Sequence, residues 1–111
     1  MKIQVRIDEY MRESLEKYIF NNGLYKERVK LNEVATKIVI EWLNNPVLDR
    51  KNMIYSRANE FRNVIIIIFL SEKQYEKIYK ILVSDYGRDC RTPNTLIYNI
   101  IKQFIESKGL N

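Results

Sequence analysis

Two short strand patterns, far apart in the chain, constrain its fold more than any other feature. The first is "KIQVRI", residues 2–7, in which polar and apolar side chains alternate, and the second is "VIIIIFL", residues 64–70, which is apolar throughout. Helical patterns follow each strand, so neither finds a partner in its own half of the chain. Because the N–H and C=O groups of a strand need hydrogen-bond partners, these strands must pair with each other or with the strands of a second copy. Either pairing predicts a two-stranded antiparallel ribbon supported by helices.

The helical patterns have apolar residues three and four positions apart and recognisable start signals. Asp8 is a good N-cap, Ser71 forms a capping box with Gln74, and Thr92 precedes a proline at the first helical position. For the second helix, either Asn32 is the cap or the helix begins a turn earlier. We predict helices over residues 9–21, 31–45, 72–87 and 93–108.

The order strand, helix, helix therefore occurs twice, and the two halves also align residue by residue. Asp8 matches Ser71, and Asn32 matches Asn94. We predict a mainly α fold with a short β-ribbon, built from residues 1–45, a linker at 46–62, and a second repeat at 63–111. A chain of 111 residues is too short for two independent cores, so the halves should pack on each other or on a second copy.

Composition argues against several functional classes. The chain has no histidine, one cysteine and three scattered glycines, so it lacks the usual general base, a zinc-ligand set and any glycine-rich phosphate loop. We therefore expect no enzyme activity, no metal and no cofactor. The single cysteine favours a reducing compartment such as the cytoplasm, and no apolar run is long enough to span a membrane. The net charge of +5 fits an anionic partner.

A short alternating strand, a capped helix, Gly23 and a second helix together resemble the ribbon-helix-helix DNA-binding superfamily of Arc, MetJ and CopG. Two copies in one chain resemble the tandem ribbon-helix-helix regulators of archaeal filamentous viruses. The resemblance implies a sequence-specific, double-stranded DNA-binding regulator of transcription, located in the host cytoplasm if the protein is viral. It also implies a homodimer or higher oligomer, in which the second strand is one candidate contact. We expect the first strands of two chains to pair and enter the major groove, with pairing of both strands within one chain as the alternative.

The resemblance also assigns roles to particular residues. The outward side chains of the first strand would read base edges, because lysine and arginine donate to guanine and glutamine pairs with adenine. These are Lys2, Gln4 and Arg6. The starts of the second helix of each repeat would bind phosphates, through Lys26, Arg28, Lys30 and Asn32 in the first repeat and Arg88, Arg91, Thr92 and Asn94 in the second. Glu33 is a discordant charge at the first of these helix starts.

Plainer interpretations stand beside these assignments. The polar strand face and the cationic loop could simply be solvated surface, and Trp42 and Phe104 are expected to pack in the core. The second strand carries Ile65, Ile67 and Phe69 where the first has its polar residues, so it cannot hydrogen-bond to bases and should be buried on both faces. The alternative function is an antitoxin-like or other protein-interaction module that does not read DNA sequence.

Overall fold

In a computed structural model of the chain, which describes residues 1–49, 62–87 and 90–110, one antiparallel ribbon lies against a layer of helices. The ribbon consists of β1 (Lys2–Ile7) and β2 (Val64–Phe69). Within the described residues the α-helices are α1 (Glu9–Asn21), α2 (Leu31–Trp42), α3 (Glu72–Ile81) and α4 (Pro93–Ser107). A 3₁₀ turn, η1 (Leu24–Glu27), follows α1, and a π-helical turn, η3 (Leu82–Tyr86), extends α3. The protein is thus mainly helical, with a small two-stranded sheet.

The expectation that the first strands of two chains pair is wrong for this structure, because β1 pairs with β2 of the same chain. The register places Lys2 opposite Phe69, Gln4 opposite Ile67 and Ile7 opposite Val64. Pairing within one chain is favoured because the connection between the strands gives them a high effective concentration. Each chain therefore carries a complete ribbon of its own.

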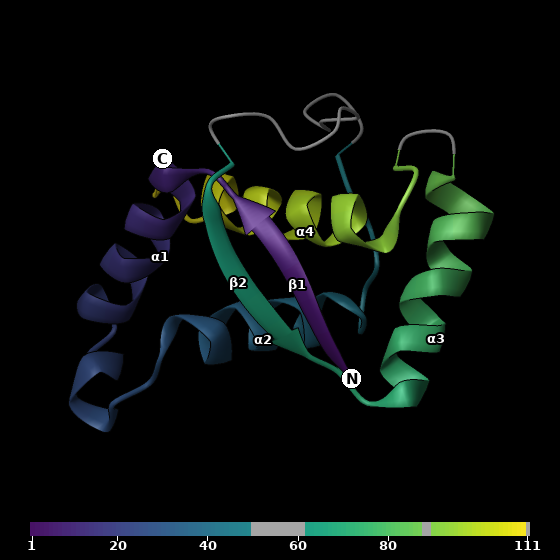
Figure 1. The fold of residues 1–111 in the computed structure, drawn as a ribbon. Coiled ribbons are helices and arrows are strands. Elements are labelled where there is room, and N and C mark those ends of the chain that lie inside the picture. Colours follow the sequence, from purple (N-terminus) through teal and green to yellow (C-terminus); the bar gives the residue numbers. More distant parts are fainter. Residues whose placement is uncertain (50–61, 88–89, 111) are drawn as a thin grey trace.

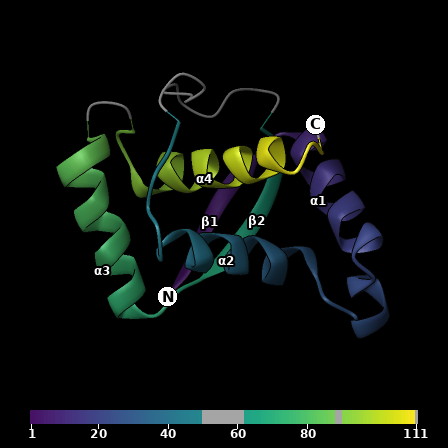
Figure 2. The same cartoon turned by 180° about the vertical axis from the view of Figure 1, so that it is seen from behind.

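The inner face of the ribbon forms one layer of the hydrophobic core. Alternate side chains of both strands point to this face, and those of Val5, Ile7, Ile66 and Ile68 are almost wholly buried. As Figures 1 and 2 show, α2 and α4 lie side by side across this face, α2 against β2 and α4 against β1, while α1 packs on both helices at one end. The buried cluster contains residues from both halves of the sequence, so the halves pack on each other as expected.

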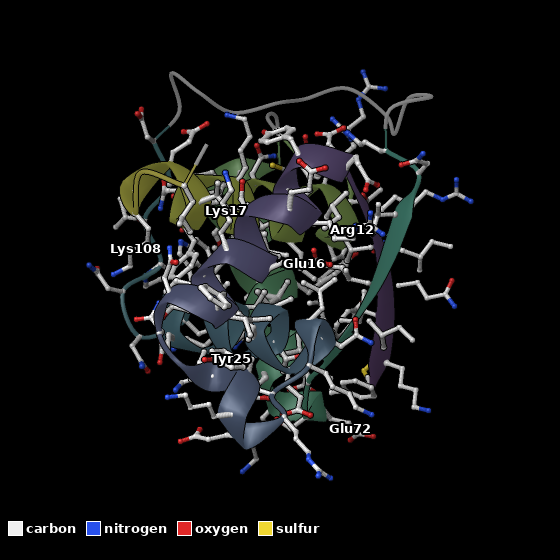
Figure 3. The ribbon with its side chains drawn as sticks, turned by 90° about the vertical axis from the view of Figure 1, so that its left-hand side faces the viewer. Arg12, Glu16, Lys17, Tyr25, Glu72 and Lys108 are labelled. Carbon is white, nitrogen blue, oxygen red and sulfur yellow. The ribbon has the colours of Figure 1, made fainter. Side chains whose placement is uncertain are left out.

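The outer face of the ribbon is not covered by the described part of the chain. Ile65 is 52% exposed and Phe69 is 45% exposed, so the expectation that the second strand is buried on both faces is wrong. The physical reason is that a ribbon of two strands offers two faces and the helices lie on only one of them. Figure 3, seen from the side of α1, shows the strands at one edge of the molecule with the helices to one side.

The helices begin where the sequence predicted, but α2 ends at Trp42 rather than at residue 45, and α3 gives way to η3 after Ile81. Ser71 and Gln74 form the predicted capping box, and the hydroxyl of Thr92 accepts from the backbone N–H of Thr95 at 3.2 Å. Asp8 occupies the N-cap position of α1, but its side chain makes no capping hydrogen bond. Lys30, rather than Asn32, occupies the N-cap position of α2. Both Asp8 and Asn32 instead bind across the fold, as described below.

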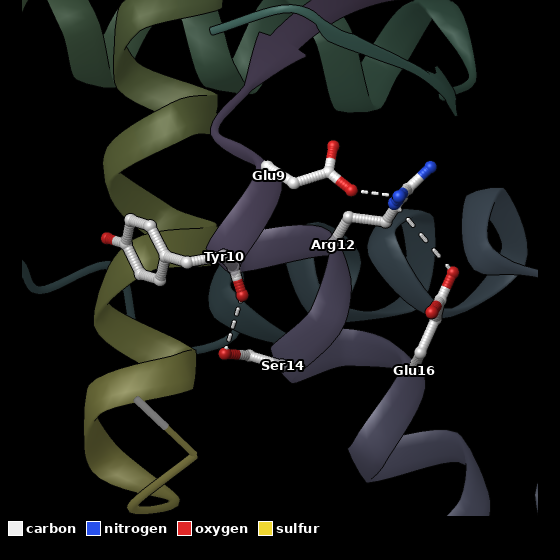
Figure 4. A network of polar contacts seen from close by, with 5 residues as sticks. All are labelled: Glu9, Tyr10, Arg12, Ser14 and Glu16. Carbon is white, nitrogen blue, oxygen red and sulfur yellow. Dashed lines mark hydrogen bonds and ion pairs between the residues drawn. The ribbon is translucent and has the colours of Figure 1, made fainter. Parts of the chain in front are cut away.

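The exposed side of α1 carries its own ion pairs. The guanidinium of Arg12 bonds to the carboxylate of Glu9, and its Nε lies 3.9 Å from Oε1 of Glu16 (Figure 4). The hydroxyl of Ser14 donates to the backbone carbonyl of Tyr10 at 2.8 Å. Arg12 is thus held between two carboxylates on α1, which offset its positive charge.

The predicted linker at residues 46–62 lies mostly outside the described residues. Its first part runs from α2 without regular structure, and the indole N–H of Trp42 donates to the carbonyl of Val47 at 3.0 Å. Trp42 is 9% exposed and packs beside Tyr86, which confirms its expected place in the core. Phe104 is half-buried and contacts the ring of Tyr18 edge-on. No helix in the described ranges combines the length and apolar character that crossing a membrane requires.

Candidate nucleic-acid interface

The outer face of the ribbon has one polar and one apolar strand. The three side chains that the sequence predicted to read bases are all exposed on β1 and directed away from the core. Opposite each of them lies an apolar side chain of β2, and the Nζ of Lys2 sits 5.8 Å from the centre of the Phe69 ring. We call this surface the ribbon face, which comprises Lys2, Gln4, Arg6, Ile65, Ile67 and Phe69.

A pocket of about 470 Å³ opens beside the ribbon face at the start of α4. Gln4 and Arg6 line it from β1, and Arg91, Thr92 and Asn94 line it from the start of α4. These are five of the residues that the sequence singled out, and they come from the two ends of the chain. The structure thus brings predicted base-reading and phosphate-binding residues from the two halves of the sequence to one place, which we call the α4 pocket.

The electrostatics of the α4 pocket favour an anion. The unpaired N–H groups at a helix start carry partial positive charge, and the first turn of α4 contains no acidic residue. Arg6, Arg62 and Arg91 add three guanidinium groups to the lining, and no carboxylate belongs to the described residues that line the pocket. A phosphate group is the common biological anion that such a site would attract.

Arg62 and Tyr98, which the sequence did not single out as binding residues, also line this pocket, and Asp8 holds Tyr98 in place without lining it. The hydroxyl of Tyr98 donates to the carboxylate of Asp8, and the guanidinium of Arg62 stacks 4.0 Å from the centre of the Tyr98 ring. Burial, followed by the hydrogen bond to Asp8, raises the pKa of Tyr98 well above its ordinary value. Tyr98 therefore stays a neutral donor that fixes α4 to the start of α1. Nothing in the local sequence marks this triad, because Tyr98 and Asp8 are 90 residues apart.

The two predicted asparagines each form one hydrogen bond to the ribbon, on opposite edges. The side-chain oxygen of Asn32 accepts from the backbone N–H of Ile67 at 3.0 Å. The side-chain nitrogen of Asn94 donates to the backbone carbonyl of Gln4 at 2.7 Å. Because Gln4 and Ile67 are opposite each other in the register, the starts of α2 and α4 meet the ribbon at the same central pair. Contact of either asparagine with phosphate stays a prediction.

The predicted cations of the first repeat lie around the start of α2. Lys26 is in η1, Arg28 adopts a left-handed conformation with φ of 58°, and Lys30 precedes the helix. All three side chains are exposed, as is Glu33 in the first turn. Lys30 directly precedes the helix start that contacts β2 through Asn32, and Arg91 lies just before α4 in the pocket beside β1. The remaining predicted residue, Arg88, lies outside the described residues.

Comparison with known proteins adds no assignment: no family model matches the chain, and neither a curated protein nor a solved structure shows significant similarity to it.

Proposed function

We propose that the protein is a sequence-specific, double-stranded DNA-binding regulator of transcription, built as a tandem ribbon-helix-helix pair within one chain. The observation that carries the proposal is the exposed row Lys2, Gln4 and Arg6, which projects from a ribbon flanked by two helix starts. A two-stranded ribbon is narrow enough to enter the major groove, where these side-chain types recognise base edges.

The contacts of the two asparagines support the tandem arrangement. Asn32 and Asn94 occupy matching sequence positions, and each binds the central residue of one strand. The two contacts differ in kind, because Asn32 accepts from an N–H and Asn94 donates to a carbonyl, but both meet the same Gln4–Ile67 pair. In a ribbon-helix-helix dimer two chains would supply these halves, whereas in the proposed arrangement one chain would supply both.

Phosphate binding would hold the ribbon in the groove from both sides. Arg91 and Thr92 at one edge, and Arg28 and Lys30 at the other, are exposed and lie beside helix starts. Contacts of this kind set position and affinity without reading sequence. Base contacts and phosphate contacts can therefore be separated by mutation.

The decisive experiment selects bound duplexes from a random pool and measures affinity for a selected and a scrambled duplex at several salt concentrations. Replacing Lys2, Gln4 and Arg6 by alanine should abolish discrimination between the two duplexes, since each good base contact contributes about 1–3 kcal/mol. Replacing Arg28 or Lys30 should weaken binding to both duplexes and lower the salt slope by about 0.9 per lost contact.

A charge-matched control is available on the opposite side of the molecule. Lys17 and Lys108 are exposed near the α1 side and away from the ribbon face (Figure 3), so the double variant Lys17→Ala, Lys108→Ala removes two positive charges without touching the interface. It should retain discrimination. Unchanged discrimination in the triple ribbon variant would refute base reading by β1.

A protein-interaction module is the second candidate, and the exposed Ile65 and Phe69 favour it. It predicts no salt-sensitive binding to any duplex. Oligomerisation through β2 also stays a prediction, and sizing of the purified protein tests it.

A further inference from the structure

We infer that the α4 pocket binds a small phosphate monoester whose organic part is apolar or aromatic. The site itself stands independently of the proposed function, but one consequence rests on that function. Gln4 and Arg6 line the pocket and also belong to the ribbon face. A monoester held by Arg6 would therefore compete with DNA for the same side chain, and it would act as an effector that lowers DNA affinity.

The charge of the pocket matches that of a phosphate monoester. Arg6 lines it from β1 and Arg91 lines it from the segment before α4. Both arginines are exposed and form no ion pair with the described part of the chain, while the carboxylate of Asp8 bonds to Tyr98 and does not line the pocket. A monoester carries about two negative charges near neutral pH, and each guanidinium can bind phosphate oxygens through two parallel hydrogen bonds.

The pocket also has an apolar interior. Val5 and Tyr98 belong to its lining although they are only 1% and 2% exposed, so the pocket extends down to the hydrophobic core. Ile65, which lies opposite Arg6 in the ribbon and is 52% exposed, adds an apolar side wall. An anion alone gains nothing from such walls, because apolar atoms replace none of the hydration of a charged group. The interior therefore matches an organic group attached to the phosphate.

The shape of the pocket favours a small molecule over the backbone of DNA. A volume of about 470 Å³ falls within the range of about 300–1,000 Å³ that is usual for small-molecule sites. A backbone phosphate is a diester with a sugar on each side, so the strand must continue along the outside and only its phosphate can meet the exposed arginines. A monoester has one free end. Its phosphate can bind the arginines while its organic part lies against Val5 and Ile65.

Calorimetric titration of the full chain with three probes tests the site. Phenyl phosphate has both groups that the pocket should recognise, methyl phosphate has the same charge without the ring, and phenol has the ring without the charge. Near neutral pH and at constant ionic strength, we expect phenyl phosphate to bind at least about ten-fold more tightly than methyl phosphate, because each ring carbon removed from water contributes about four-fold. We expect no measurable binding of phenol.

Variants assign the binding to the pocket. Arg91→Ala should weaken the binding of phenyl phosphate by about ten-fold or more, since a charge-assisted contact is lost. Ile65→Ala should weaken the binding of phenyl phosphate but not that of methyl phosphate. Lys17→Ala, which removes an equal charge from the exposed side of α1, should change neither affinity.

A competition measurement with the selected duplex tests the consequence for DNA. Saturating phenyl phosphate should weaken binding of the duplex, and the same concentration of methyl phosphate should weaken it less. Absence of phenyl phosphate binding, equal affinity for the two phosphates, or binding that Arg91→Ala leaves unchanged would each overturn the site while leaving the proposed function intact. Duplex binding that persists on the phenyl phosphate complex would overturn the competition. Binding of phenyl phosphate without binding to any duplex would support the site and overturn the proposed function alone.

Discussion

Two neighbouring residues of β2 provide a direct test of which ribbon face is buried. Ile66 is fully buried and Ile65 is 52% exposed, yet both are isoleucines in the same strand. Ile66→Ala removes three carbon atoms from the core, which lowers the free energy of unfolding by about 2.4 kcal/mol, and the cavity raises the loss to about 3–4 kcal/mol. For Ile65→Ala we expect about 1 kcal/mol, because half of the side chain is already in water and water fills the space.

Urea unfolding, followed by the fluorescence of the single tryptophan, Trp42, measures both losses. With the dependence of the unfolding free energy on urea concentration that is typical for a domain of this size, the midpoints of the two variants should differ by about 1–2 M urea. The midpoint of the wild-type protein should not depend on protein concentration, since both strands of the ribbon belong to one chain. Equal losses in the two variants would refute the assignment of inner and outer faces. A midpoint that rises with concentration would show that contacts between chains stabilise the fold.

Three further predictions concern the elements around the ribbon. The folded-state pKa of Tyr98 lies above its ordinary value of 10.0. The stability that this residue contributes is therefore present below pH 10 and is lost as the pH rises above 10. Above pH 10, the urea midpoint of Tyr98→Phe should fall less steeply with pH than that of the wild type. Ser71→Ala removes one half of the capping box with Gln74 and should lower stability by about 1 kcal/mol, measured by the same titration; an unchanged midpoint would show that the cap adds nothing. Cys90 is fully buried, so a thiol reagent should modify it only as fast as the fold opens, and rapid labelling of the native protein would contradict that burial.

Local signals predicted the helices well because they depend on nearby residues. The end at Asn21 follows from the glycine that comes after the helix, whereas Asp8 occupies the N-cap position without making a capping hydrogen bond. The capping box at Ser71 was equally readable, since its two members are three residues apart.

Strand pairing and the burial of β2 could not be predicted in the same way, because they depend on residues far apart in the sequence. The partner of β1 depends on how the whole chain closes, and the alternation of Ile3, Val5 and Ile7 fits either partner equally well. The burial of β2 was overestimated because an apolar strand indicates burial on both faces only when a second layer exists. Here the described chain places helices on one face.

The candidate site was predicted residue by residue but not as an assembly. Arg6 and Arg91 each appeared as a cation in a separate repeat, and only the intrachain ribbon brings them to one pocket. The Asp8–Tyr98 contact that supports this pocket joins a residue chosen as a helix cap to a tyrosine for which the sequence predicted no role. The role of Asp8 as a cap does not suggest this partner.

The side chains of α2 that hydrogen-bond to the outer edge of β2 also affect the tendency of the chain to aggregate. The segment "VIIIIF" has the composition of an amyloid-forming strand, with high β-propensity and no charge. In the fold one of its edges is occupied by β1, and on the other the N–H groups of Ile67 and Phe69 bond to Asn32 and Thr36 of α2. A further strand cannot add there while α2 remains docked. Addition of a further strand at this edge would therefore require α2 to detach first, so α2 protects the segment from edge-to-edge pairing.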